Sequence, residues 1–319
     1  MSDPDVVVFR HSIHGRNVAG YVEALRERLP DREVRLAETP TRERALVRRA
    51  PVVTGAYLSE DLLAHAEQLR LFACTYAGVG HLPLDAIEER GIAVTNASGV
   101  HGPNIAEYVL GSMLSFAQGL HRAWQRQQRR EYRSFRTREL TDSTVTVVGL
   151  GAIGRTVVDR LEPFDVETVG VRYTPGKGGP TDEVLGFEDD VHEAFARTDY
   201  LVLACPLTDV TEGLVDEEAF YTLPADSVVI NVARGKVVDT GALVAALQRN
   251  RIRGAVLDVT DPEPLPADHD LWTFSNVLIT PHNAGDTPHY YERVADILAE
   301  NLRRVDETGS YENLENRAV

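Results

Sequence analysis

The sequence predicts two α/β domains, each with a doubly wound parallel sheet, and the second domain is expected to be inserted into the first. Short runs of β-branched residues alternate with helical patterns in two successive series, one before and one after residue 144. Such alternation is typical of βα units that build parallel sheets. The chain of 319 residues is long enough for two domains with sizeable cores.

The first series predicts a complete, flavodoxin-like domain. Strands are expected at 6–9, 34–37, 51–54, 71–74 and 92–95, with helices between them at 18–29 and 59–68. A longer helix is expected from Pro103, a residue that suits the first turn, through Val109, Met113 and Phe116.

The second series predicts a Rossmann-like domain. Strands are expected at 144–148, 166–171, 200–203, 228–232, 254–257 and 277–280, with a helix at 241–247. A closing helix at 288–305 and the tail are expected to return to the first domain. The predicted boundaries are therefore 1–99 with 287–319 for one domain and 100–286 for the other.

A glycine fingerprint follows the strand at 144–148. Gly149, Gly151 and Gly154 are spaced as G-x-G-x-x-G, with Ala152 and Ile153 between the last two, and a helical pattern follows. The glycines permit a tight turn, a close approach of the backbone to a pyrophosphate and close packing of helix on strand. The N–H groups at the start of the helix favour phosphate. We therefore expect these residues to bind a dinucleotide.

The residue at the end of the next strand predicts which dinucleotide binds. An acid for the ribose 2′-hydroxyl is expected about 20 residues after the fingerprint, and Arg172 stands there instead. A carboxylate would repel a 2′-phosphate, whereas a guanidinium attracts it. NADPH and NADP are therefore expected as cofactors, with NADH and NAD as the weaker alternative. An arginine at a strand end can also be merely solvated.

The chain is strongly acidic. Its 49 acidic and 33 basic residues give a net charge of −16, and Lys177 and Lys236 are its lysines. A general electrostatic attraction to nucleic acid or to an anionic membrane is therefore not expected. An acidic surface poor in lysine favours a halophilic source, in which counter-ions screen the self-repulsion. An ordinary acidic cytosolic protein is the alternative.

Other features of the sequence predict a soluble, cytoplasmic protein. The acidic N-terminus has no apolar core of a signal peptide, and no apolar run approaches the length of a membrane span. Cys74 and Cys205 lie far apart in apolar segments and are expected to be buried thiols without a disulfide. No metal site is expected.

Polar clusters follow three successive strands of the second series. Arg234 lies in the first cluster, Asp258 and Glu263 lie in the second, and His282 lies in the third. Because the carboxyl ends of parallel strands meet at one edge of a sheet, these side chains are expected to share one crevice.

These residue types suit the reduction of a 2-oxo acid by hydride. His282 would deliver a proton to the substrate oxygen, and Glu263 would fix the tautomer of the imidazole and stabilise its charged form. Arg234 would grip the carboxylate and carbonyl oxygens together. Asp258 would accept a hydrogen bond from the nicotinamide carboxamide. Taken singly, each residue could instead be a surface or capping group.

Five segments occur in a specific order and spacing: VTVVGLGAIGR, ACPLTDVTEGLVD, INVARGKVVD, LDVTDPEPLP and NVLITPHNAG. Together they resemble the D-isomer-specific 2-hydroxyacid dehydrogenase family over nearly the whole chain. The resemblance implies that Arg234, Glu263 and His282 are catalytic and that Asp258 faces the nicotinamide. It also implies cofactor contacts, besides the glycine turn and Arg172, from Cys205, Pro206, Thr211, Ala233 and His282.

A segment of the first domain, YAGVGHLPLD at 76–85, resembles the loop of this family whose backbone N–H groups bind the substrate carboxylate. The substrate-binding residues are therefore expected to be Tyr76, Ala77, Gly78, Val79, Arg234 and His282. Residues 1–99 with 287–319 would then form the substrate (catalytic) domain, and 100–286 would form the NAD(P)-binding domain. The pocket for the substrate side chain is expected around Tyr57, Tyr76, Leu82 and Tyr290.

The leading hypothesis is an enzyme, an NAD(P)H-dependent D-2-hydroxyacid dehydrogenase that reversibly reduces a 2-oxo acid. The alternatives are a glyoxylate/hydroxypyruvate reductase, a phosphoglycerate-dehydrogenase-like enzyme and, in another class, a dinucleotide-sensing co-repressor-like binding protein. The chain ends at Val319 without the regulatory domain of many phosphoglycerate dehydrogenases, so a role in serine biosynthesis is not favoured. The resemblance implies a homodimer formed through the helix from Pro103 and residues 124–135, and neither nucleic acid nor membrane is expected as a partner.

Overall fold

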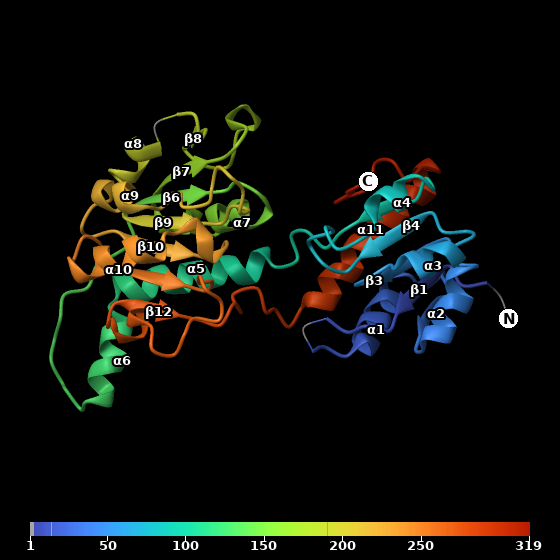
Figure 1. The fold of residues 1–319 in the computed structure, drawn as a ribbon, viewed down its shortest axis with the longest axis horizontal. Helices are drawn as coiled ribbons and strands as arrows, with labels where there is room; N and C mark the ends of the chain where they lie inside the picture. The colour runs from blue at the N-terminus through green and yellow to red at the C-terminus, as the bar shows by residue number, and fades with distance from the viewer. Residues whose placement is uncertain (1–2, 14, 190) are drawn as a thin grey trace. The chain divides into compact units, whose positions relative to one another are not determined.

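The computed structural model describes residues 3–13, 15–189 and 191–319. The described chain divides into two compact units (Figure 1). The first comprises the residues up to Val100 together with Asp286–Val319, and the second comprises His101–Gly285. The last helix and the tail thus belong to the same unit as the N-terminal half.

A five-stranded parallel sheet forms the centre of the first unit. The strands are β1 (Val6–Phe9), β2 (Val34–Ala37), β3 (Val52–Gly55), β4 (Leu71–Cys74) and β5 (Ala93–Thr95), in the order β2-β1-β3-β4-β5. The chain direction across the sheet therefore reverses between β1 and β3. This is the strand order of flavodoxin-like folds, and ligands bind them at the reversal point, outside the carboxyl ends of the strands.

Helices cover both faces of this sheet, which explains why its strands read as continuous apolar runs. Side chains alternate between the faces of β1: Val6 and Val8 pack with α1 (Val18–Arg28) and α11 (Tyr290–Thr308). Val7 and Phe9 pack on the other face, with the helices α2 (Pro40–Val47), α3 (Glu60–His65) and α4 (Leu84–Glu88).

The short helices differ most from the sequence-based expectation. Helix α2 was not among the helices named from the sequence, although Thr39 caps it by accepting a hydrogen bond from the N–H of Arg42 and Pro40 starts its first turn. Helix α3 spans fewer residues than the 59–68 predicted, because Ser59 is its N-cap and Ala66 leaves the helical conformation.

A seven-stranded parallel sheet forms the centre of the second unit. The strands are β6 (Thr144–Val148), β7 (Glu167–Val171), β8 (Glu183–Leu185), β9 (Tyr200–Leu203), β10 (Val228–Asn231), β11 (Gly254–Leu257) and β12 (Val277–Ile279). Their order is β12-β11-β10-β9-β6-β7-β8, so the direction of winding reverses between β6 and β9. This is the Rossmann order with one additional strand, and the predicted fold class is confirmed.

Among the described residues of this unit, six α-helices accompany the sheet: α5 (Gly102–Ala117), α6 (Leu120–Gln128), α7 (Ala152–Leu161), α8 (Val191–Phe195), α9 (Glu217–Thr222) and α10 (Thr240–Gln248) (Figure 1). Helix α5 packs against α7, and its apolar side chains, such as Val109, Met113 and Phe116, enter the core beside β6. None of the helices in the described ranges is long and apolar enough to cross a membrane.

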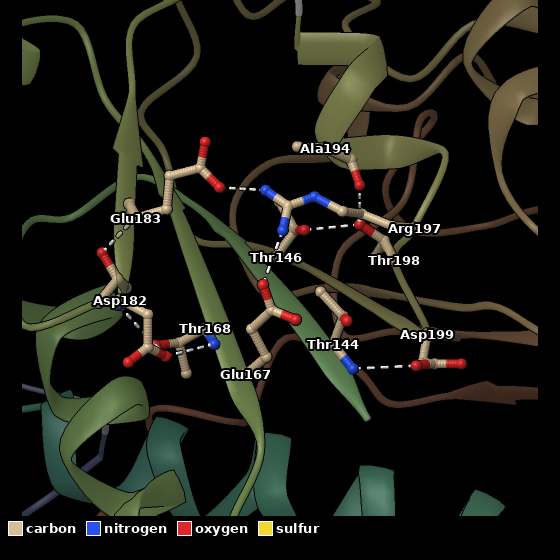
Figure 2. Close-up of polar contacts among 11 residues, drawn as sticks. Thr144, Thr146, Glu167, Thr168, Asp182, Glu183, Ala194, Arg197, Thr198 and Asp199 are labelled. Atoms are coloured by element: carbon tan, nitrogen blue, oxygen red, sulfur yellow. Dashed lines mark hydrogen bonds and ion pairs between the residues drawn. The ribbon is translucent and has the colours of Figure 1, made fainter. Parts of the chain in front are cut away.

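A polar network joins the amino ends of β7 and β8 (Figure 2). Arg197 pairs with Glu167 at 2.7 Å and also with Glu183. The carboxylate of Asp182 accepts hydrogen bonds from the hydroxyl and the N–H of Thr168, and these bonds hold its pKa below the usual range. This network anchors one edge of the sheet, whereas the polar clusters predicted from the sequence follow the opposite, carboxyl ends.

Candidate active site

The glycine turn lies between β6 and α7, where the winding of the sheet reverses. Gly149 has a φ of 100°, and a Cβ there would lie 2.7 Å from the carbonyl of Ala204. A Cβ at Gly154 would lie 1.9 Å from the carbonyl oxygen of Gly149. The fold itself therefore excludes side chains at both positions.

Gly151 differs from the other two glycines, because a Cβ there would meet no atom within 4 Å. Gly151 is also the N-cap of α7, and no side chain caps this helix. The first N–H groups of α7, from Ala152 and Ile153 onward, thus face open space with the positive end of the helix dipole behind them. This arrangement fits a pyrophosphate, which needs close approach to backbone N–H groups.

The segment after β9 closes the other side of the turn. The backbone of Cys205 lies next to Gly149, and burial raises the pKa of the Cys205 thiol to about 11, so it remains protonated at neutral pH. The hydroxyl of the buried Thr211 donates to the carbonyl of Pro206 at 2.7 Å and accepts from the N–H of Thr208 at 2.8 Å. The hydrogen bonds of Thr211 therefore stabilise the conformation of the loop at 206–211.

Arg172 follows β7 directly and is half-buried. Its Nη1 donates to the carbonyl oxygen of Gly178 at 2.5 Å. Its Nε is buried and has no hydrogen-bond partner among the described residues. The bond to Gly178 holds the guanidinium at the end of the strand while other N–H groups stay available.

His282 and Glu263 are brought together by the loops that follow β12 and β11. The distance between Nδ1 of His282 and Oε1 of Glu263 is 2.7 Å, and both side chains are about half exposed. Nε2 of His282 makes no hydrogen bond to any described residue. A carboxylate on Nδ1 keeps the proton there in the neutral ring and leaves Nε2 as the nitrogen that can accept a hydrogen bond.

Asp258 organises the loop that carries His282. Its carboxylate is buried and accepts hydrogen bonds from the hydroxyl of Thr280 at 2.6 Å and from the N–H groups of Asn283 and Ala284, each at 3.0 Å. The N–H of His282 donates to the carbonyl oxygen of the same aspartate at 2.9 Å. These contacts hold His282 at a φ of 54°, a conformation that few residues other than glycine adopt. The carboxylate of Asp258 thus accepts most of its hydrogen bonds from groups of the protein itself. The contact with the nicotinamide expected from the sequence would have to be made beside these bonds.

Arg234 lies at the adjacent strand end, after β10. The buried Asn231 fixes this turn, because its side chain accepts from the N–H of Ala233 and donates to the carbonyl of Arg234, both at 3.0 Å. The guanidinium donates to the carbonyl of Ala233 at 2.6 Å, and no carboxylate of the described chain is within ion-pair distance of it. A Cβ at Gly235 would lie 2.0 Å from the carbonyl oxygen of Thr260, so the loops after β10 and β11 touch.

Three residues at the start of α5 support the His282 loop and were not singled out from the sequence. His101 contacts the carbonyl of Gly285 at 2.8 Å, Asn104 donates to the carbonyl of Ala284 at 2.6 Å, and the hydroxyl of Tyr108 bonds that of Thr280 at 2.6 Å. Burial raises the pKa of Tyr108 to about 12. The spacing of three and four residues places all three on one helix face, which is the signal that the sequence offered.

The proposed carboxylate loop belongs to the first unit and follows β4. The N–H groups of Ala77, Gly78 and Val79 donate to no described group, and a Cβ at Gly78 would meet nothing within 4 Å. Tyr76 is half-buried, whereas Tyr290 is buried and its hydroxyl donates to the carbonyl of Thr75. Tyr290 and the buried Leu82 are therefore core residues of this unit.

The described ranges hold no group of three or more His, Cys, Asp or Glu side chains that could bind a metal ion. The candidate site of the second unit is thus built from one imidazole, one arginine, two carboxylates and the glycine turn.

Comparison with protein families adds the decisive observation. Residues 110–284 match the NAD binding domain of the D-isomer specific 2-hydroxyacid dehydrogenases. This match covers more than half of the chain. The chain belongs to the D-isomer-specific 2-hydroxyacid dehydrogenase family. The resemblance noted in the sequence is thereby confirmed.

Relatives within this dehydrogenase family carry different names. The chain is 33% identical over 86% of its length to a D-3-phosphoglycerate dehydrogenase of Methanocaldococcus jannaschii, of which it spans 53%. It is 35% identical over 75% of its length to the glyoxylate reductase/hydroxypyruvate reductase of Homo sapiens, of which it spans 74%. The chain thus spans about half the length of the phosphoglycerate dehydrogenase and about three quarters of the reductase.

Solved structures of 2-hydroxyacid dehydrogenases have the same fold. A family protein from Aeromonas salmonicida is 27% identical with a TM-score of 0.77, covering 100% of this chain and 99% of that one. A dehydrogenase from Xanthobacter autotrophicus Py2, solved in complex with NADPH and MES, is 26% identical with a TM-score of 0.77, covering 99% and 98% of the two chains.

Proposed function

We propose that this protein is an NAD(P)H-dependent D-2-hydroxyacid dehydrogenase that reversibly reduces a 2-oxo acid. The observation that carries the proposal is the 2.7 Å contact between His282 and Glu263. It lies at the carboxyl ends of the strands, as do Arg234 and the glycine turn that fits a dinucleotide. Family membership supports the same reaction class.

The reaction needs a proton donor, and His282 supplies it. A bound nicotinamide dinucleotide supplies the hydride. Protonated His282 transfers a proton from Nε2 to the substrate oxygen, while Glu263 accepts a hydrogen bond from Nδ1 and so fixes the orientation of the ring. In the opposite direction, neutral His282 removes the hydroxyl proton.

Arg234 and the loop after β4 hold the substrate in this proposal. The planar guanidinium can bind a carboxylate oxygen and the 2-oxo oxygen together, and in doing so it polarises the carbonyl. In the first unit, the N–H groups of Ala77, Gly78 and Val79, which donate to no described group, are proposed to bind the substrate carboxylate. Tyr76 flanks this loop.

The test is oxidation of NADPH or NADH followed at 340 nm with a series of 2-oxo acids, in high and in low salt. Oxidation that depends on a 2-oxo acid supports the proposal. Binding of the dinucleotide without turnover of any 2-oxo acid would contradict it and favour the co-repressor-like binding protein. The names of the relatives make glyoxylate, hydroxypyruvate and phosphohydroxypyruvate the first substrates to compare.

We also propose that NADPH is preferred to NADH. Arg172 carries this proposal, since its buried Nε has no described partner and its bond to Gly178 keeps the guanidinium at the end of β7. The Xanthobacter autotrophicus relative was solved with NADPH, which agrees with this choice.

Arg172→Asp is expected to lower the ratio of kcat/KM for NADPH to that for NADH by about 100-fold. The change removes an attraction for the 2′-phosphate and adds a repulsion, and each contributes about a factor of ten. Arg160→Asp is the matched control, because Arg160 lies on the exposed part of α7 and pairs there with Glu107. Equal ratios in the two variants would show that another group binds the 2′-phosphate.

We propose a homodimer formed through α5, α6 and the segment that follows α6. Exposed apolar side chains lie there: Leu120, Trp124 and Tyr132. Residues 120–139 contain seven arginines and two glutamates, which give this segment a charge of +5. Because the net charge of the whole chain is −16, the other residues together carry −21. A basic segment on an acidic protein is electrostatically complementary to a second copy.

We propose, finally, that the protein works in a cytoplasm of high salt. The support is compositional: 49 acidic residues against 33 basic ones, of which two are lysines. Screening by concentrated counter-ions reduces the repulsion that this excess of negative charge produces.

A further inference from the structure

A cavity lies in the first unit, at the carboxyl ends of β1 and β3. Its volume is about 210 Å³, and it is lined by residues that follow these strands and by the starts of α2 and α3. The strand order of this sheet reverses between the same two strands. Parallel sheets bind ligands at such a reversal, so the position itself indicates a binding site.

Aromatic rings connect this cavity to the loop proposed to bind the substrate carboxylate. Tyr57 lines the cavity, and its ring lies edge-on to Tyr76 at 5.9 Å and to His81 at 5.1 Å between ring centroids. Tyr76 directly precedes the N–H groups of Ala77 and Gly78. The ring of Tyr57 therefore lies between the cavity and Tyr76, the residue at the start of the loop proposed to bind the substrate carboxylate.

The charged side chains of the cavity neutralise one another. Nε of Arg10 lies 3.5 Å from Oε2 of the buried Glu43, whose other oxygen accepts a hydrogen bond from the N–H of Arg10 at 3.2 Å. Arg44 donates to Asp61 at 3.0 Å. The two guanidinium groups and two carboxylates balance one another in charge, while His11 also lines the cavity and the buried Nε of Arg10 has no hydrogen-bond partner among the described residues. A phosphate there would have to compete with carboxylates already in place.

The remaining lining is largely apolar or uncharged. Phe9 and Leu62 contribute hydrocarbon, and Tyr57 presents a ring that is about half exposed. Burial, together with the neighbouring hydroxyl of Tyr57, raises the pKa of Tyr76, so this phenol is uncharged at neutral pH. Since a water molecule occupies about 30 Å³ of the liquid, the cavity has room for a substituent of several carbon atoms.

We propose that this cavity binds the side chain of the substrate, and that the preferred substrates are 2-oxo acids whose third carbon carries an uncharged substituent rather than a phosphate. The proposal rests on the function proposed above, because it names the substrate class of that same reaction. It separates the two kinds of relative, since the substrate named in a phosphoglycerate dehydrogenase carries a phosphate on its third carbon.

The first experiment compares kcat/KM for 2-oxohexanoate, hydroxypyruvate, 3-phosphohydroxypyruvate and glyoxylate with NADPH and with NADH. We expect 2-oxohexanoate and hydroxypyruvate to exceed 3-phosphohydroxypyruvate by at least about tenfold, corresponding to one unfavourable charge contact. A preference for 3-phosphohydroxypyruvate would overturn the inference and leave the proposed reaction intact. Reduction of none of the four would instead contradict the proposed reaction.

A charge variant tests whether the cavity is responsible. Asp61→Asn removes one carboxylate of the cavity and leaves Arg44 unneutralised. The ratio of kcat/KM for 3-phosphohydroxypyruvate to that for hydroxypyruvate is expected to rise about fivefold, the effect of one charge contact near water.

Glu67→Gln is the matched control. It removes an exposed carboxylate that pairs with Arg48 and does not line the cavity. Its ratio should equal that of the unchanged protein. An equal rise in both variants would show a general effect of net charge, and no rise in Asp61→Asn would show that the substrate side chain binds elsewhere; either result would overturn the inference.

Discussion

His282→Asn is expected to lower kcat by roughly 10²- to 10⁴-fold, the contribution of a positioned acid or base. Asparagine is chosen because it tolerates the left-handed backbone that His282 adopts at a φ of 54°. It can form hydrogen bonds, but it cannot deliver a proton at neutral pH. The measurement is single-turnover oxidation of NADPH with a 2-oxo acid that the unchanged protein reduces.

The dissociation constant for NADPH serves as the control for this variant. Asparagine keeps a hydrogen-bonding side chain at this position, and the glycine turn and Arg172 lie on other loops, so the constant should change by less than about threefold. A kcat close to that of the unchanged protein would assign the proton transfer to another group. A large loss of cofactor affinity would show instead that the substitution disturbs the loop that Asp258 holds.

The convergence of Arg234, Glu263 and His282 on one edge of the sheet follows from sequence features that are local. Each residue comes a few positions after a β-branched run, and parallel strands align their carboxyl ends. Neither step needs knowledge of packing. The strands predicted from such runs match the observed ones to within one residue at each end. The short edge strand β8 (Glu183–Leu185) was not predicted, because its three residues do not form a β-branched run.

The support of the site could not be predicted in this way. His101, Asn104 and Tyr108 contact residues that lie 172 to 184 positions further along the chain, and two of these contacts are to backbone carbonyls, which leave no trace in the sequence. The bond from Arg172 to Gly178 is of the same kind. Such contacts depend on the position that a helix or loop takes relative to the sheet, and this position is determined by side-chain packing.

The role of Asp258 shows the same limit at a residue that was singled out. Its type and position suggested a ligand for the nicotinamide carboxamide. The structure shows three donors from the loop at 280–284 on its carboxylate, together with nearly complete burial. Buried carboxylates are retained where donors satisfy them, and these donors could be counted only after folding.

Gly154→Ala is expected to lower the free energy of unfolding of the second unit by about 3 kcal/mol or more, the upper range for overpacking. The new Cβ would lie 1.9 Å from the carbonyl oxygen of Gly149, and backbone on both sides leaves neither group free to move. Helix α7 would have to separate from β6. Urea denaturation followed by circular dichroism measures the change.

Gly151→Ala is the matched variant, and it separates folding from binding. Its Cβ meets no atom within 4 Å and its backbone lies in the extended region, so the cost in stability is about 1 kcal/mol at most, that of alanine at an N-cap. The same methyl group would occupy the space in front of the first turn of α7. We expect at least about a tenfold rise in the dissociation constant for NADPH, measured by fluorescence titration. If Gly151→Ala bound NADPH normally, the pyrophosphate could not lie against this turn, and the fingerprint would serve only to pack α7 on β6.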